Sequence, residues 1–386
     1  EAIQRSLSSD APARGSNATP PAPPPQTPAP RGFSLQSLNP DLSFIADVAG
    51  AWFSKGEPFQ TGGHDPTERG FNLQALEMAV SKAVDPFFRF DANFAFSQEG
   101  VEIEEAYATS LSFPFRTQLR VGQFLTRFGR INNTHPHTWA FVDQPFAIGR
   151  VFGGDGNRGL GAELSWLTPL PWYVELVGSV TDARGENTAR SFFGAEPLPL
   201  RSPLDLQITG ALKQFFAVSD DLSLLWGLST AAGPNSTGGE RNRTDVYGTD
   251  LYLKFRPISD PSNPTIVSLQ VEALYRRRQI PDALLRDLNG YAEIFWRFEP
   301  RWGIASRYEM GTGDDLFREP AVEDPLDPDW GRLRQRVSAN VTFWPTEFSR
   351  VRLQGASSVI DTAARPEYSL FLAFEFAVGA HGAHVF

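Results

Sequence analysis

Apolar and polar side chains alternate along this chain in short segments that recur from residue 42 to residue 376. In 88–96, for example, the even positions are apolar, whereas the odd positions are Arg89, Asp91, Asn93 and Ala95. A period of two residues is typical of β-strands, because successive side chains of a strand point to opposite faces. The alternation therefore predicts a chain built from β-strands.

Counted in this way, the chain contains about sixteen strands. The predicted strands are 42–53, 71–84, 88–96, 101–112, 115–127, 160–166, 172–180, 204–212, 222–228, 245–255, 267–275, 290–298, 301–310, 337–343, 348–358 and 370–376.

The connections between these strands are of two kinds that take turns along the chain. Tight connections rich in Pro or Asp lie at 85–86, 113–114, 169–171, 219–221, 299–300 and 345–347. Longer polar connections lie at 54–70, 128–157, 183–203, 232–243, 280–286, 312–331 and 359–366. Two connections break the rule, since 99–100 is short where a long loop is due and 256–264 is long where a tight turn is due. Short turns at one end and long loops at the other are typical of bacterial outer-membrane barrels, whose short turns and termini face the periplasm.

A soluble β-sandwich also hides an apolar face, so the prediction of a membrane protein rests on further features. The apolar faces are rich in Phe, Leu and Trp, the opposite faces are charged or polar, and aromatic residues gather at strand ends, as at Trp172 and Trp296. The chain has 31 Phe and 9 Trp against 2 Met, and it ends on an alternating segment and Phe386. No run of apolar residues is long enough for a spanning helix. We therefore expect a closed transmembrane antiparallel β-barrel, because an open sheet edge in lipid would leave backbone groups unpaired.

The first residues differ from the rest. Residues 1–33 are rich in proline, show no periodicity and offer little apolar surface to bury, which predicts a disordered periplasmic extension before a barrel of residues 34–386. Either this extension is a plain tail, or it tethers the barrel to a periplasmic or peptidoglycan partner. The net charge of −10 disfavours nucleic acid as a partner, and the absence of cysteine excludes disulfides.

Three motifs resemble a known family. The segment 121–130 contains Arg127-Phe128-Gly129-Arg130, the segment 141–145 follows in a long connection, and the strand that starts at Arg158 comes next. This order resembles the sixteen-stranded outer-membrane porins of the phosphate-selective O/P type, over roughly residues 70–180. The resemblance implies a passive channel for small solutes or ions across the outer membrane of a Gram-negative bacterium, with a long loop folded inside the barrel.

If the polar positions of the strands face inward, charged side chains line the lumen. The candidates for pore lining and selectivity are Arg89, Arg116, Arg120, Arg130, Arg334, Arg336, Arg350 and Arg352. Inward carboxylates are about as numerous, so these arginines either pair across strands or leave a local basic patch. Fixed charge in a narrow pore sets the sign of the permeant ion. The best candidate for such a patch is formed by the two pairs 334/336 and 350/352.

The connection 128–157 is too long and too aromatic for a bare solvated loop. We expect it to fold into the lumen and bury Trp139, Phe141 and Phe146, rather than pack on the outer rim. His135 and His137 within it supply only half of the ligands that zinc needs, so we expect hydrogen bonds and no metal. The pair His381 and His384 receives the same interpretation, and no cofactor is expected.

No enzyme motif is present, since both Gly-x-Ser-x-Gly and the phosphate-binding Gly-x-x-x-x-Gly-Lys-Ser/Thr pattern are missing. The interpretation is therefore a non-enzymatic porin that contacts outer-membrane lipid and lipopolysaccharide and is compatible with a homotrimer. The alternative is a structural barrel whose lumen is occupied by a partner or by its own tail. Conductance in a planar bilayer separates the two.

Overall fold

The structure is a computed structural model that describes residues 39–56, 58–97, 100–182, 191–193, 200–238, 242–258, 260, 262–313, 332–360 and 365–379. The predicted extension 1–33, the pair His381 and His384, and Phe386 lie outside the described residues. Residues from Pro40 onward form one compact unit.

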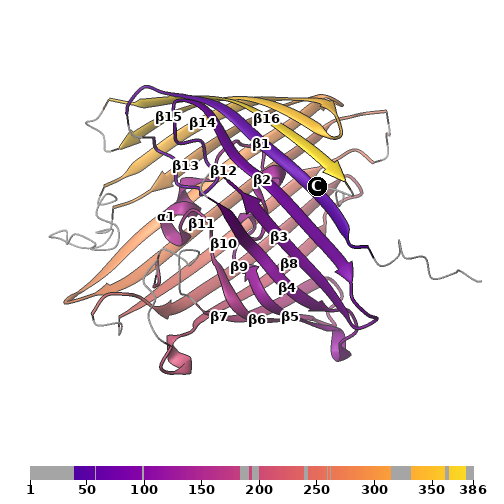
Figure 1. The fold of residues 1–386 in the computed structure, drawn as a ribbon, viewed down its shortest axis with the longest axis vertical. Helices are drawn as coiled ribbons and strands as arrows, with labels where there is room; N and C mark the ends of the chain where they lie inside the picture. Colours follow the sequence, from indigo (N-terminus) through magenta and orange to yellow (C-terminus); the bar gives the residue numbers. More distant parts are fainter. Residues whose placement is uncertain are drawn as a thin grey trace, which may run out of the picture. The chain divides into compact units, whose positions relative to one another are not determined.

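The described residues form sixteen strands in one closed antiparallel barrel, as the sequence predicted (Figure 1). The strands are β1 (Asp41–Phe53), β2 (Gly70–Ala83), β3 (Phe88–Phe96), β4 (Val101–Ser110), β5 (Thr117–Leu125), β6 (Arg158–Leu167), β7 (Tyr173–Asp182), β8 (Gln207–Ala217), β9 (Leu222–Pro234), β10 (Arg243–Phe255), β11 (Ile266–Ile280), β12 (Ala283–Glu299), β13 (Trp302–Gly311), β14 (Arg334–Thr346), β15 (Ser349–Ile360) and β16 (Glu367–Gly379). Each strand pairs with its neighbours in sequence, and β1 pairs with β16, with Asp47 opposite Glu375, to close the barrel.

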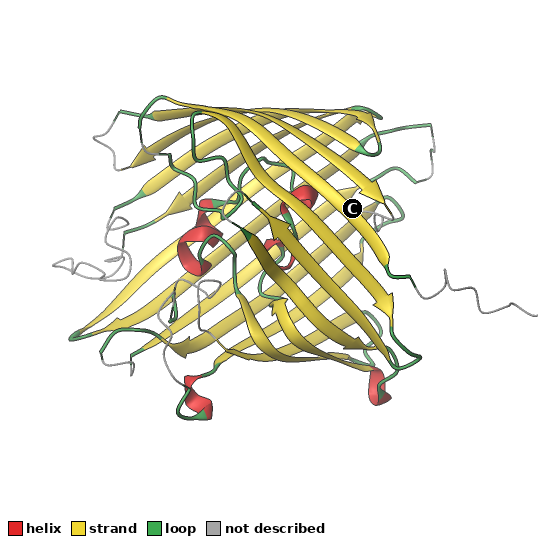
Figure 2. Cartoon of the chain, viewed as in Figure 1, coloured by secondary structure: helices red, strands yellow, loops and turns green. Residues whose placement is uncertain are grey.

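Short helices lie in the connections. They are η2 (Pro114–Arg116), η3 (Ile131–Asn133), η4 (Pro136–Thr138), α1 (Phe146–Phe152) and η5 (Pro203–Asp205). Three of them, η3, η4 and α1, belong to the connection between β5 and β6, and Figure 2 shows helices within the barrel. Among the described residues, no helix has the length and apolar character needed to cross a membrane.

The two faces of the wall differ as the alternation predicted. On β16 the side chains of Leu370, Leu372 and Phe376 are exposed on the outer face, whereas Phe371 and Glu375 are buried on the inner face. Exposed tryptophans, including those at 52, 172, 226, 296 and 302, lie mostly toward strand ends. An apolar outer band with aromatic residues near its edges is what a bilayer requires of a barrel.

One predicted long loop is absent. Residues 280–286 were expected to form a polar connection, but β11 and β12 extend toward each other until only Pro281 and Asp282 link them, with Ile280 opposite Ala283. Asp282 has a φ of 61°. Aspartate tolerates this left-handed conformation better than most residues, which permits the tight hairpin. The apolar Ile280 and Leu285 are buried, and their burial favours continued strands over a solvated loop.

Candidate functional site

The connection between β5 and β6, residues 126–157, runs inside the barrel, and we call it the inner loop. Its backbone N–H groups donate to side chains of the wall: Gly129 to Ser229 of β9 (3.0 Å), Ile131 to Glu272 of β11 (2.8 Å) and Phe146 to Glu309 of β13 (2.7 Å). Figures 1 and 2 show α1 within the barrel. The predicted fold into the lumen is therefore confirmed, with Phe141 and Phe146 buried and Trp139 partly buried.

Apolar packing explains why this segment stays inside. Phe128 and Phe152 meet edge to face, with ring centroids 4.9 Å apart, and Ile148 and Val151 of α1 are fully buried. Together with Ile131, Ala147, Phe192, Phe193 and the wall residues Ala231, Val246, Leu274 and Tyr291, they form an apolar cluster within the barrel. Burying one such side chain stabilises the folded state by about 1.5–3 kcal/mol. The cluster therefore holds the first and last parts of the inner loop against β9, β10, β11 and β12.

A buried carboxylate fixes the middle of the inner loop. Asp143 accepts a hydrogen bond from Arg307 Nη2 on Oδ1 (2.6 Å) and one from Gln354 Nε2 on the same oxygen (2.8 Å), and Arg336 Nη2 lies 2.5 Å from Oδ2. Burial alone would raise the pKa of Asp143, but the guanidinium groups of Arg336 and Arg307 outweigh it and hold the pKa well below its usual value. Asp143 is thus an anion that, together with Glu309 of β13, neutralises the buried cations Arg307 and Arg336.

The arginines of β15 also bind the inner loop. Arg350 donates from Nη1 to the carbonyl of Trp139 and from Nη2 to that of His137, both at 2.9 Å. Arg352 donates from Nη1 to the carbonyl of Phe141 at 2.6 Å, and both arginines form ion pairs with Glu375. These side chains therefore attach the loop to the wall.

The remaining predicted selectivity residues are spread over the barrel. Arg336 pairs with Asp143, as described, and the guanidinium of Arg334 lies 5.4 Å from the ring centroid of Phe59. Arg120 pairs with Glu163 at 3.0 Å, and Arg130 donates to Gln270 at 3.0 Å while lying over the Tyr252 ring. Arg89 pairs with Asp91 near one end of β3, and Arg116 is exposed in the turn formed by η2. The structure thus places only part of the set at the inner loop, and the role of these arginines in selectivity stays a prediction.

A cavity of about 390 Å³ adjoins the inner loop. Its lining comes from the inner loop and from the ends of β10, β11, β12, β14 and β15 that lie next to the connections 256–265, 300–301 and 347–348. The charged lining residues are Arg130, Lys254, Glu293, Arg297 and Arg350. The aromatic lining residues are Trp139, Tyr252, Phe295 and Trp344. Four cations against one carboxylate make this cavity basic.

Histidines and glutamates gather where the inner loop faces β2 and β4. His135 contacts Glu104 and Glu105 of β4, and His137 Nδ1 lies 2.8 Å from Glu77 of β2. From the first loop (residues 54–69), His64 Nε2 lies 2.7 Å from Glu104. Burial alone would lower the pKa of His64, but the hydrogen bond and the charge of Glu104 raise it to about 9.

Sequence reasoning did not identify the partners of these histidines. Glu77, Glu104, Glu105 and Asp143 are all buried and all contact the inner loop or belong to it, yet none was singled out. A signal was present in β4, where Glu102, Glu104 and Glu105 break the strict alternation of the strand. The register between β3 and β4 shifts at this point, because a β-bulge turns two successive glutamates inward.

Comparison with known proteins yields one relative by sequence. No family model matches the chain. An uncharacterized protein from Aquifex aeolicus (strain VF5) is 32% identical over 399 residues, which span 92% of this chain and 81% of the relative. The chain belongs to the family of this Aquifex protein. The description of that relative assigns no activity.

Solved structures share the fold at low sequence identity. The outer membrane channel DcaP of Acinetobacter baumannii matches with a TM-score of 0.60 at 12% identity, over 88% of this chain and 97% of that chain. OprB of Pseudomonas putida also gives 0.60, at 9% identity over 90% and 96%. An anion-selective porin from Comamonas acidovorans gives 0.58, at 10% identity over 88% and 99%. These solved structures show that the chain has the barrel fold of outer-membrane channels and porins.

Proposed function

We propose that the protein is a porin in which small solutes diffuse through a lumen narrowed by the inner loop. The observation that carries the proposal is a closed barrel whose inner face is polar and charged, and whose basic cavity of about 390 Å³ ends at the inner loop. Charged groups on a wet inner wall suit passage of hydrated solutes. The likeness to solved outer-membrane channels and porins supports the same function.

The charge of the cavity favours anions as the permeant ions. Arg130 and Arg350 line it together with Lys254 and Arg297, and a cationic constriction lowers the free energy of an anion within it. Because the chain resembles phosphate-selective porins, phosphate is a candidate for the permeant anion. Among the predicted selectivity residues, Arg130 is the one whose guanidinium stands at the cavity while its backbone belongs to the inner loop.

Planar-bilayer recording tests the proposal. The purified protein should give discrete, stable conductance steps, and its reversal potential in a salt gradient should indicate anion preference. Arg130→Glu should move the reversal potential toward cations. The matched control Arg116→Glu, which changes an exposed arginine in a turn, should move it much less. Phosphate, if it is the solute, should reduce the chloride current at concentrations where sulfate does not.

A second candidate function is a barrel filled by its own loops. It is favoured by the apolar cluster within the barrel, which includes Phe192 and Phe193 from the connection after β7 as well as the inner loop. A barrel of this kind would act as a structural shell. Protein that inserts into the bilayer, as shown by heat-modifiable migration, but gives no conductance steps would support this function over the porin.

The proposed porin also has predicted contacts with the membrane, with other copies of the chain and with peptidoglycan. The barrel contacts outer-membrane lipid and lipopolysaccharide through its apolar face. A trimer form is described for OmpT of Vibrio cholerae, which shares this fold at 7% identity and a TM-score of 0.54. A homotrimer of this chain is a prediction that native mass spectrometry checks. Contact between residues 1–33 and peptidoglycan is a further prediction, which a pull-down with purified sacculi checks.

A further inference from the structure

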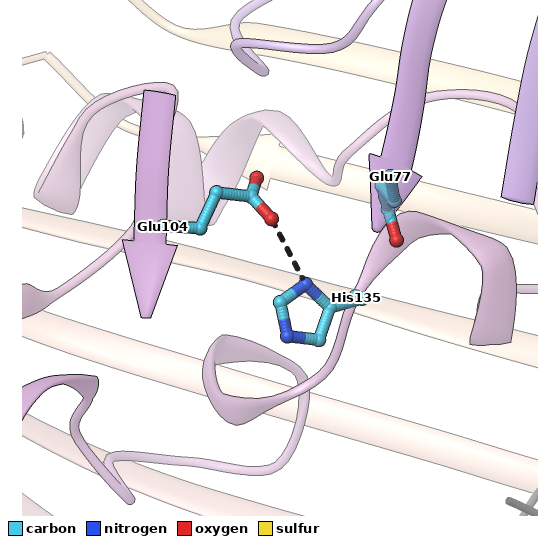
Figure 3. A group of neighbouring side chains, drawn as sticks. All are labelled: Glu77, Glu104 and His135. Atoms are coloured by element: carbon cyan, nitrogen blue, oxygen red, sulfur yellow. Dashed lines mark ion pairs between the residues drawn. The ribbon is translucent and has the colours of Figure 1, made fainter. Parts of the chain in front are cut away.

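We propose that Glu77, Glu104 and His135 form a binding site for one divalent transition-metal ion of the zinc class, which links the inner loop to the wall of the barrel. The site goes beyond the proposed channel function and does not depend on it. Glu77 is contributed by β2, Glu104 by β4 and His135 by the inner loop (Figure 3).

The three side chains converge on one point. Each offers one ligand atom, and these atoms all lie within 4.8 Å of one another. Figure 3 shows the carboxylates of Glu77 and Glu104 on either side of the His135 ring. The distance from His135 Nδ1 to Glu104 Oε2 is 3.4 Å. Bonds of about 2.0–2.2 Å around a tetrahedral zinc ion place neighbouring ligand atoms about 3.4 Å apart, so this pair already has the spacing of two zinc ligands.

Two buried oxygens independently indicate a ligand. Oε1 of Glu77 and Oε2 of Glu104 accept no hydrogen bond from the described residues, although both side chains are more than nine-tenths buried. A buried carboxylate oxygen without a donor is costly, because it has lost its hydration. A metal ion bound between the two oxygens would restore that interaction.

The surrounding contacts orient the three ligands. His135 Nε2 lies 3.1 Å from Oε2 of Glu105 and 3.0 Å from Nδ2 of Asn93. In the tautomer in which Nε2 donates to Glu105, the lone pair of Nδ1 is available on the side of Glu104. His64 Nε2 holds the other oxygen of Glu104 at 2.7 Å, and His137 Nδ1 holds the other oxygen of Glu77 at 2.8 Å. A carboxylate behind a ligating histidine, and hydrogen bonds to ligating carboxylates, are the usual supports of protein metal sites.

The donor set and its accessibility define the class of ion. One imidazole nitrogen with two carboxylates suits zinc and its neighbours, whereas calcium and magnesium prefer oxygen ligands alone. Glu77, Glu104 and Glu105 together concentrate negative charge that a divalent ion offsets. His135 also lines the cavity of about 390 Å³, so an ion has a route to the site from that cavity.

Isothermal titration of the full-length protein in detergent, after treatment with a chelator, tests the site with Zn²⁺ alone. The expected result is one Zn²⁺ per chain, which a hundredfold excess of Mg²⁺ does not displace. Glu104→Gln and His135→Asn should each weaken Zn²⁺ binding at least tenfold. The double variant His381→Ala/His384→Ala removes two of the five histidines of the chain and keeps His64, His135 and His137. It should bind Zn²⁺ as the unaltered protein does.

Heat-modifiable migration on a gel establishes that each variant is folded. If Glu104→Gln or His135→Asn does not fold, X-ray absorption at the zinc edge of the unaltered protein decides, since the site requires one imidazole and carboxylate oxygens around the metal. Absence of stoichiometric binding would overturn the proposal, and so would binding that survives His135→Asn or is lost in the His381/His384 variant. In those cases His135 is an ion-pair partner of Glu104 and Glu105 only.

Discussion

Replacing Asp143 by asparagine removes the carboxylate of the inner loop that pairs with Arg307 and Arg336 inside the barrel, and it leaves Glu309 of β13 as the remaining carboxylate in contact with both. Both guanidinium groups stay buried in the variant, because their strands form the wall and cannot move into water. Removing one partner of a buried ion pair costs about 3–5 kcal/mol. The substitution destabilises the state in which the inner loop is bound to the wall, which we call docked. Undocking of the loop therefore becomes more favourable while the barrel stays closed.

The size of the effect follows from that free energy. A change of 1.4 kcal/mol is a factor of ten in an equilibrium constant, so the lower estimate of about 3 kcal/mol raises the undocked population about a hundredfold. Amide hydrogen exchange reports such local opening. Exchange in peptides from 140–152 of Asp143→Asn should therefore be about a hundredfold faster, whereas peptides from β10 and β11 should keep their rates.

Asp91→Asn provides the matched control. Asp91 pairs with Arg89, whose side chain is about half exposed, and an exposed ion pair contributes about 0–1 kcal/mol. This variant should leave exchange in the inner loop unchanged. If Asp143→Asn exchanged in 140–152 at the same rate as the unaltered protein, the buried ion pairs would not be what fixes the loop.

Three further predictions concern the wall, the loops and the extension. Gly154→Ala should lower stability by about 1–3 kcal/mol in thermal unfolding, because its Cβ would lie 2.7 Å from the backbone nitrogen of Gly63; Gly178→Ala, with nothing within 4 Å, should have little effect. Leu372→Arg should destabilise the barrel by about 2–4 kcal/mol in urea unfolding in lipid, because Leu372 is on the outer face near the middle of β16; equal stability would place that face outside lipid. Deletion of residues 1–33 should leave membrane insertion and thermal unfolding unchanged, and loss of assembly would show that the extension is structural.

The strands and the inner loop were predictable from sequence for a physical reason. Outward side chains of a membrane-spanning strand face lipid and are therefore mostly apolar. The alternation in 88–96 and 370–376 can thus be recognised without knowledge of the tertiary structure. The inner loop was predictable because Phe141 and Phe146 have no favourable place in water. By contrast, β11 and β12 were predicted too short, since the last outward positions of β11 are the polar Arg277 and Gln279, where the apolar alternation stops.

The partners of the charged side chains were not predictable in the same way. The sequence left open whether Arg350 and Arg352 pair across strands or form a basic patch. In the structure they pair with Glu375 of the next strand and donate to carbonyl groups of the inner loop, and their role in selectivity stays a prediction. The alternation predicts which side chains face inward, but it does not predict which groups of the inner loop contact them. The cluster at Glu104 depends in addition on a β-bulge, which shifts the alternation by one residue.

In the proposed porin, the inner loop narrows an open channel. Single-channel conductance of the unaltered protein, compared with a variant in which residues 130–155 are replaced by a short glycine linker, tests it most directly. We expect discrete steps for both proteins and a conductance several times larger for the variant, because water then fills the space that the inner loop occupies. Equal conductance in the two proteins, with heat-modifiable migration showing both to be folded, would contradict it.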